Sequence, residues 1–184
     1  MRVIGGAFRG RRLRAPHGQL VRPTSDRMRE TLFNILAPLV AGSRFLDICA
    51  GSGAVGIEAL SRGASAVTFI DRSRRACLAI EENLNAIGAS REATVINRDA
   101  AAALKRLAEQ SAQFDIAFFD PPYSSEIHSQ VIGLLSSSNL LADDAIVVVE
   151  HHKKTPPERE YDGLKMYREV KQGESALAFY RMMK

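Results

Sequence analysis

Apolar residues are grouped along this chain into short continuous runs separated by longer stripes at helical spacing. Continuous runs are typical of strands that are covered on both faces of a parallel sheet. Five runs predict strands, at residues 44–48, 66–71, 94–97, 115–120 and 145–150. Four stretches at helical spacing predict helices, at residues 54–62, 77–87, 100–109 and 127–135. This alternation predicts a doubly wound α/β sheet with right-handed crossovers.

Before the first run, the pattern predicts one helix. Ser25 and Asp26 form a helix start, because a serine caps free N–H groups and an acid favours the positive end of the helix. The apolar face expected to lie on the main body consists of Met28, Leu32, Ile35, Leu36 and Leu39.

Both ends of the chain depart from the alternation. Residues 3–14 read as a short, strongly basic β-hairpin. Residues 164–167 and 176–180 flank the turn-like KQGE (171–174), so we expect the sheet to finish with an antiparallel strand. Such a finish favours the methyltransferase version of the fold over a pure dinucleotide-binding domain.

Length and composition predict one globular domain in a reducing cytoplasm. The chain has 184 residues, of which 46% are hydrophobic and 25% are charged. No apolar run approaches the roughly 18 residues of a membrane span, and the N-terminus lacks the apolar stretch of a secretory signal. Cys49 and Cys77 are too few for a disulfide framework.

Positive charge is concentrated near the N-terminus. Residues 1–25 contain six arginines and no acidic residue, whereas the other 19 basic residues are balanced by 21 acidic ones. A basic segment on a mildly acidic body predicts a contact between this region and a polyanion. A solvated arginine-rich segment is the alternative. The six arginines are Arg2, Arg9, Arg11, Arg12, Arg14 and Arg22.

Gly51, Gly53 and Gly56 spell G-x-G-x-x-G between the first predicted strand and the helix that follows. This loop fits either a dinucleotide or S-adenosylmethionine, because glycines let the backbone turn sharply and approach a ligand. Asp47 precedes the loop and would repel a pyrophosphate, whereas it would attract the cationic sulfonium and ammonium of S-adenosylmethionine. The loop and its acid together favour S-adenosylmethionine.

Acidic residues follow the next predicted strands as well. Ligands of open α/β sheets bind beyond the carboxyl ends of the strands, where these acids lie. Asp71 could accept hydrogen bonds from both ribose hydroxyls, and Asp99 from the adenine amine. We expect Ala100, the next residue, to contact the same cofactor.

The fourth predicted strand ends in Asp120, Pro121, Pro122 and Tyr123. D-P-P-Y is the signature of methyltransferases that modify exocyclic amines of nucleobases. The Asp120 carboxylate and the Pro121 carbonyl can hold such an amine, so that its delocalised lone pair turns toward the methyl group. The prolines stiffen the loop, and Tyr123 offers a face on which an extruded base can stack.

The whole chain resembles the bacterial RsmD-type 16S rRNA (guanine-N2)-methyltransferases. The segments that carry the resemblance are MRVIGGAFRGRRL (1–13), RPTSDRMRETLFNIL (22–36), LDICAGSGAVGIEALSRGA (46–64) and FFDPPY (118–123). The resemblance implies a class I S-adenosylmethionine-dependent methyltransferase domain over residues 23–184. Its Rossmann-like, mostly parallel sheet would have seven strands. Residues 1–22 would form an RNA-gripping hairpin extension.

The resemblance also assigns roles to individual residues. Gly51, Gly53, Asp71 and Asp99 would bind S-adenosylmethionine, and the DPPY motif would form the guanine pocket. Arg9, Arg11, Arg12 and Arg14 would meet RNA phosphates. The expected partner is 16S rRNA or the small ribosomal subunit, with no metal, membrane or obligate protein partner. Cys49 departs from the family pattern and is expected to be a small buried apolar residue.

Four alternatives stay open on the sequence. An N6-adenine methyltransferase acting on DNA or RNA could use the same DPPY motif, although no segment is long enough for a separate DNA-recognition domain. A glutamine methyltransferase would usually carry Asn in place of Asp120. A non-catalytic RNA-binding module would not need both motifs. A nicotinamide-dependent reductase would need a hydride-transfer site, and we find none. The directions in which Arg27 and Arg29 face stay open as well.

Overall fold

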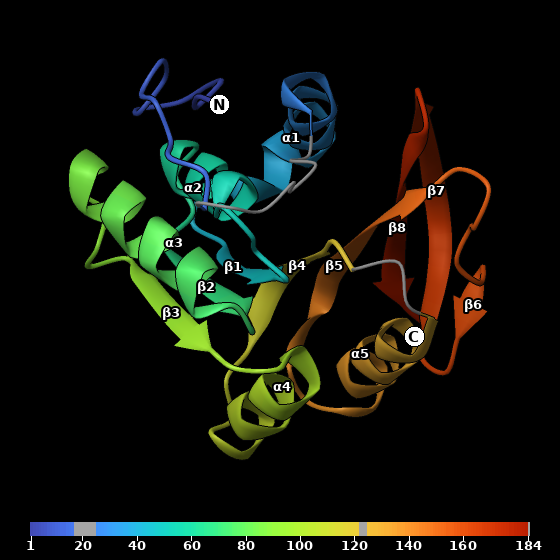
Figure 1. Ribbon diagram of the computed structural model, residues 1–184. Helices are drawn as coiled ribbons and strands as arrows, with labels where there is room; N and C mark the ends of the chain where they lie inside the picture. The colour runs from blue at the N-terminus through green and yellow to red at the C-terminus, as the bar shows by residue number, and fades with distance from the viewer. Residues whose placement is uncertain (17–24, 122–124, 184) are drawn as a thin grey trace.

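The apolar runs form the strands of one α/β sheet in the computed structural model, which describes residues 1–16, 25–121 and 125–183 (Figure 1). The strands are β1 (Arg44–Ile48), β2 (Ala66–Asp71), β3 (Ala93–Asn97), β4 (Phe114–Phe119), β5 (Leu141–His152), β6 (Glu160–Tyr161), β7 (Leu164–Gln172) and β8 (Ser175–Met182). The helices are α1 (Asp26–Val40), α2 (Ala54–Ser61), α3 (Arg74–Ile87), α4 (Ala100–Glu109) and α5 (Ser125–Ser137).

The order of the strands creates a crevice at the centre of the sheet. The described residues form eight strands in the order β3-β2-β1-β4-β5-β8-β7-β6. Strands β1 to β5 pair in parallel, and the chain moves outward from β1 to β3 before it returns to β4 beside β1. Loops at the carboxyl ends of β1 and β4 therefore diverge, which is where ligands bind in open α/β sheets.

The antiparallel finish is confirmed and is longer than predicted. β8 pairs antiparallel with both β5 and β7. The two-residue strand β6 then pairs with β7, so the described sheet has eight strands rather than the seven expected. Two residues give too short a hydrophobic pattern for β6 to be predicted from the sequence.

Helices cover both faces of the sheet (Figure 1). Side chains of α1, α2 and α3 share one apolar cluster with one face, and side chains of α4 and α5 share a second cluster with the other face. This two-sided burial explains why the parallel strands are continuously apolar. No helix among the described residues is long and apolar enough to cross a membrane.

Helix α1 begins as predicted but turns a slightly different face to the core. The Ser25 hydroxyl accepts a hydrogen bond from the Met28 amide at 3.1 Å, which caps the helix. Leu39 is 43% exposed, whereas Phe33 and Val40 are fully buried. The expectation for Leu39 was wrong because the buried stripe is rotated by about one residue toward Phe33 and Val40.

Residues 1–16 form a tight antiparallel turn that is shorter than the predicted hairpin. Its one isolated bridge joins Arg2 and Arg12, and residues 17–22 of the predicted segment lie outside the described residues. Val3 and Leu13 are buried in the same apolar cluster as α1 and α2. The segment is therefore packed onto the domain by its own apolar side chains, while its arginines face outward.

Hydrogen bonds to two helices fix this segment in place. The buried Glu58 carboxylate of α2 accepts from the backbone amides of Ile4 and Gly5, each at 2.8 Å. On α3, the Asn83 side chain accepts from the Arg14 amide at 2.8 Å and donates to the Arg14 carbonyl at 3.0 Å. Buried side chains on two helices thus replace the strand partners that the short turn lacks.

Candidate active site

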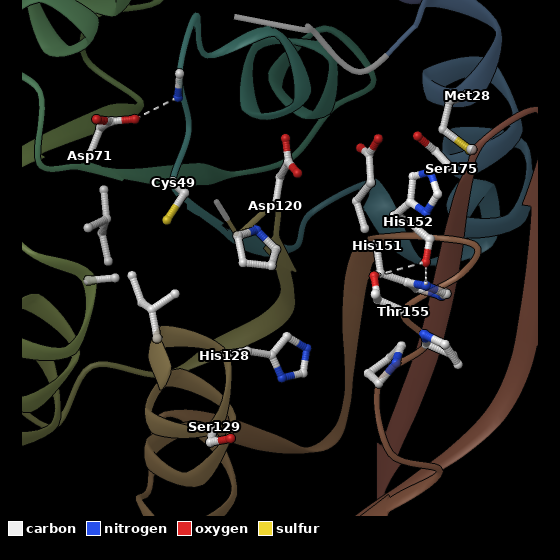
Figure 2. A pocket seen from close by; sticks show the side chains of 18 of the residues that line it. Met28, Cys49, Asp71, Asp120, His128, Ser129, His151, His152, Thr155 and Ser175 are labelled. Carbon is white, nitrogen blue, oxygen red and sulfur yellow. Dashed lines mark hydrogen bonds between the residues drawn. The ribbon is translucent and has the colours of Figure 1, made fainter. Parts of the chain in front are cut away.

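A cavity of about 1010 Å³ opens at the carboxyl ends of the parallel strands. Its wall includes residues from the loops after β1, β2, β3 and β4, from β5, and from the turn between β7 and β8. Figure 2 shows Asp71, Cys49 and Asp120 along one wall and His128 across from them. The topology therefore brings the strand-end acids Asp71, Asp99 and Asp120 into one site, as the sequence pattern predicted.

Gly53, at the end of the loop between β1 and α2, and Gly56, in the first turn of α2, leave no room for larger side chains. Gly53 has a positive φ of 74°, and a Cβ atom there would lie 2.9 Å from the Ile80 side chain. A Cβ atom on Gly56 would lie 2.3 Å from the ring of Phe69. Gly53 therefore allows the turn into the helix, and Gly56 allows α2 to pack directly on β2.

Asp71, the last residue of β2, is held against this loop. One carboxylate oxygen accepts from the Gly51 amide and the other from the Ser73 amide, each at 2.8 Å. Both residues Asp71 and Gly51 line the cavity. The two hydrogen bonds fix the orientation of the carboxylate, and each oxygen keeps further acceptor capacity for a ligand hydroxyl.

Asp99 and Ala100 lie at the start of α4 and both line the cavity. Asp99 caps the helix, since its Oδ1 accepts from the Ala102 amide at 3.2 Å. Ala100 is nearly fully buried, with 4% exposure, so its small side chain closes the wall beneath Asp99.

Asp47 lies beneath the glycine loop rather than at the cavity surface. It is the fourth residue of β1, is 1% exposed, and is not among the described wall residues. Its Oδ2 accepts from the Gly56 amide at 2.9 Å. Burial, with a smaller contribution from the charge of Asp71, raises the pKa of Asp47 to about 7. In the structure this carboxylate supports the loop from below.

Asp120 and Pro121 line the cavity directly after β4. Burial raises the pKa of Asp120 well above its ordinary value, and the charges of Glu150 and Asp47 raise it further. The Asp120 amide donates to the Ile48 carbonyl at 3.3 Å, which ties this loop to β1. Pro122 and Tyr123, the other two residues of the motif, lie outside the described residues.

Many of the wall residues were not predicted as site residues, and Glu150, Cys49 and His128 are three of them. Glu150 of β5 lies beside Asp120, and the rule that selected the other strand-end acids could have found it. Cys49 is half-buried and packs against the apolar cluster of α4 and α5, as expected of an apolar residue, but it also lines the cavity between Asp71 and Asp120 (Figure 2). Burial and the charges of three aspartates raise the pKa of Cys49 to about 12, which keeps the thiol protonated. His128 is the third.

His128 comes from α5 and contacts the C-terminal part of the sheet. Its Nδ1 lies 3.4 Å from the Tyr161 hydroxyl, and the two rings are 6.0 Å apart. Burial lowers the pKa of His128, and the neighbouring His151 lowers it further. Across the described residues, no three His, Cys, Asp or Glu side chains are grouped as they would be around a metal ion.

The basic residues of the N-terminal segment lie on the surface. The side chains of Arg9, Arg11, Arg12 and Arg14 are exposed. Arg14 also forms a surface ion pair with Glu82 of α3 at 3.2 Å. Arginines with solvated guanidinium groups remain available for phosphate contacts.

Arg27 and Arg29, whose directions the sequence left open, face opposite ways. Arg29 is completely buried and donates to the Arg2 carbonyl at 2.7 Å and to Asp26 at 2.9 Å. Arg27 is exposed and lines both the large cavity and a smaller one of about 460 Å³ next to the N-terminal segment. Arg29 therefore anchors the N-terminal segment to α1, while Arg27 lies between this segment and the large cavity.

Comparison with known proteins confirms the fold. The solved structure of the Escherichia coli protein yhhF covers 100% of this chain and 99% of its own, with 35% identity and a TM-score of 0.88. SMU.776, solved in complex with SAH, shares the fold at 12% identity and a TM-score of 0.65, over 84% of this chain and 49% of that one. The fold is that of the class I S-adenosylmethionine-dependent methyltransferases.

The family is also shown. The family described as conserved hypothetical protein 95 matches residues 1–181. Ribosomal RNA small subunit methyltransferase D of Escherichia coli strain K12 is 41% identical over 141 residues, which are 77% of this chain and 69% of that protein. The chain therefore belongs to the RsmD-type methyltransferase family.

Proposed function

We propose that this protein transfers a methyl group from S-adenosylmethionine to the exocyclic N2 amine of one guanine in 16S rRNA of the small ribosomal subunit. The main support is that one cavity is lined by Asp120 and Pro121 as well as by Asp71 and Asp99. The name of the Escherichia coli relative supports a ribosomal RNA substrate. Such an enzyme would act in the cytoplasm.

The wall formed by the ends of β1, β2 and β3 fits the cofactor. Asp71 presents a carboxylate held by two backbone amides, which suits the paired hydroxyls of a ribose. Asp99 can accept from an adenine amine while it caps α4. Asp47 supports the loop from below through its hydrogen bond with the Gly56 amide. Bound S-adenosylmethionine would supply an electrophilic methyl carbon attached to a positively charged sulfur.

At the end of β4, Asp120 and Pro121 would orient the nucleophile. The exocyclic amine of guanine is a poor nucleophile because its lone pair is delocalised into the ring. When the Asp120 carboxylate and the Pro121 carbonyl accept its two N–H groups, the lone pair is directed out of the ring plane toward the methyl carbon. The nitrogen would gain the methyl carbon as the carbon–sulfur bond breaks and leaves a neutral thioether, and it would shed one proton, which the adjacent Asp120 carboxylate could accept. Positioning supplies most of the rate enhancement.

Contacts outside the cavity would hold the RNA. Arg9, Arg11, Arg12 and Arg14 are exposed and can contact phosphates without reading the base sequence. Arg27 lies between their segment and the large cavity, where the phosphate of an extruded nucleotide would pass.

The proposal is tested with methyl-labelled S-adenosylmethionine and small ribosomal subunits from a strain that lacks this activity. We expect label in N2-methylguanosine after the RNA is digested to nucleosides, and the modified position is then mapped. Label in N6-methyladenosine would instead show that the enzyme is an N6-adenine methyltransferase. Absence of transfer to subunits, to 16S rRNA and to precursor particles would contradict the proposal. Asp120→Ala, which removes the acceptor for the amine, serves as the low-activity control.

A further inference from the structure

Two carboxylates, Asp120 and Glu150, meet in the same wall of the cavity. Their strands β4 and β5 are parallel neighbours, and the register pairs Phe119 with Val149. Asp120, directly after β4, and Glu150, on β5, are the residues that follow this pair, and both line the cavity. The charge of Glu150 is the largest charge effect on Asp120, second only to burial.

The sheet order places Glu150 away from the cofactor wall. Counting across the sheet, the order is β2, β1, β4 and β5, so Asp120 lies between Asp71 at the end of β2 and Glu150 on β5. A ligand held by Asp71 and Asp99 therefore approaches Asp120 from one side. A second ligand held by Asp120 and Glu150 occupies the other side.

Two neighbouring carboxylates define the chemistry of that second ligand. Like charges in a partly buried site repel each other, and a ligand that donates hydrogen bonds to both relieves the repulsion. Guanine offers such a pair, because its N1–H lies beside its N2 amine. Adenine offers an amine beside an unprotonated N1, whose lone pair would face a carboxylate.

We propose that Glu150 accepts the N1–H of the target guanine while Asp120 accepts its N2 amine. Glu150 is thereby the residue that selects guanine over adenine. This inference rests on the proposed function and names the part of the site that determines its base specificity. A base without the N1–H would turn its N1 lone pair toward the Glu150 carboxylate, and two acceptors that face each other in a partly buried site repel.

The test compares two bases at the mapped position. Small subunits are reconstituted with 16S rRNA that carries either guanine or 2-aminopurine there. 2-Aminopurine keeps the N2 amine, but its N1 is an acceptor. We expect the wild-type enzyme to prefer guanine by about 10- to 100-fold in kcat/KM.

Substitution of Glu150 should change this preference in a defined way. Glu150→Gln keeps an acceptor oxygen for the N1–H of guanine and adds an amide N–H that can donate to N1 of 2-aminopurine, so we expect higher activity on 2-aminopurine and a collapsed preference. Glu150→Ala removes the acceptor without adding a donor, and its preference should fall to within about threefold. Asp143→Asn, the same change at an exposed position of β5, should keep the wild-type preference.

The outcomes separate this inference from the proposed function. An unchanged preference in both Glu150 variants, or an equal loss on the two bases, would overturn the role of Glu150. Failure of the wild-type enzyme to methylate guanine would instead refute the proposed function. Calorimetric titration with S-adenosylmethionine should give a Kd within about twofold of wild type for every variant, because Glu150 lies on the side away from the cofactor wall.

Discussion

The two sides of the large cavity hold their carboxylates in opposite ways. At the ends of β2 and β3, Asp71 and Asp99 accept hydrogen bonds from backbone amides: Asp71 from Gly51 in the loop after β1 and from Ser73, and Asp99 from Ala102 in the first turn of α4. On the other side, Asp120 is half-buried next to Glu150, and both desolvation and this second negative charge raise its pKa. On the side of β2 and β3, backbone amides hold the carboxylates, whereas on the side of β4 and β5 two carboxylates lie next to each other.

This difference indicates a division of labour. Carboxylates fixed by backbone amides lose little freedom when a ligand binds, which suits the recognition of a cofactor with a constant shape. A destabilised carboxylate gains more from a ligand that donates hydrogen bonds, and that gain can be used where a reacting group must be oriented. Substitutions on the two sides should therefore affect different steps.

The largest effect is expected at Asp120. Asp120→Ala should lower the single-turnover rate of methyl transfer by about 100- to 1000-fold, because the amine loses the acceptor that directs its lone pair. The Kd for S-adenosylmethionine, measured by calorimetry, should change little. Asp143→Asn is again the control. Normal turnover in the Asp120 variant would contradict the role assigned to the base side.

Substitution of Asp71 should weaken cofactor binding and leave the rate of methyl transfer nearly unchanged. Asp71→Ala removes the acceptor for the Gly51 and Ser73 amides and for the ribose, so the Kd for S-adenosylmethionine should rise by about 10- to 100-fold. At saturating cofactor the rate should stay close to that of the wild type. Asp71→Asn keeps one acceptor oxygen, so its Kd for S-adenosylmethionine should lie between those of the wild type and Asp71→Ala. If the rate at saturation fell as far as in the Asp120 variant, the proposed division between the two sides would be wrong.

Substitution of Asp47 should change the stability of the fold rather than the activity. Its pKa in the folded protein, about 7, is above the ordinary 3.8 of an unfolded chain, so the folded state binds the extra proton between these values. The free energy of unfolding should therefore decrease as the pH rises from 5 to 7, by about 2 kcal/mol from this group.

Asp47→Asn isolates this contribution. The amide oxygen can still accept from the Gly56 amide, but the residue no longer titrates. Urea unfolding at several pH values should give a flatter pH dependence than in the wild type, with the variant relatively more stable at pH 8. An identical pH dependence in the two proteins would show that Asp47 is not the group responsible.

The smallest effect is expected for the arginines, which lie outside both sides of the cavity. Replacing Arg9, Arg11 and Arg12 together by alanine should weaken RNA binding about two- to fivefold at moderate salt and reduce the salt dependence by about one phosphate contact per arginine. Cofactor affinity should not change. A matched triple change of Arg91, Lys105 and Arg106, exposed on α4 and near β3, is the control. An unchanged salt slope would show that the N-terminal segment does not hold the RNA.

The sequence by itself determined the local elements and the edge of the sheet that carries the site. The bounds of β1, β2 and α4 agree with the predicted ones, and the Ser25 cap is present. These features depend on near neighbours, because periodicity, capping and turn residues act within a few positions along the chain. Acids just after parallel strands must then gather at one edge, which is why the positions of Asp71, Asp99 and Asp120 could be foreseen.

Only the tertiary structure decided which of these side chains lie next to each other and which are buried. Strand register brings Glu150 beside Asp120, and the packing of α2 on β1 buries Asp47 beneath the loop. Burial of Arg29 against the Arg2 carbonyl depends on how the N-terminal segment folds back onto α1. Such contacts join residues far apart in the sequence, and their energies depend on desolvation and neighbouring charge, which no local pattern records.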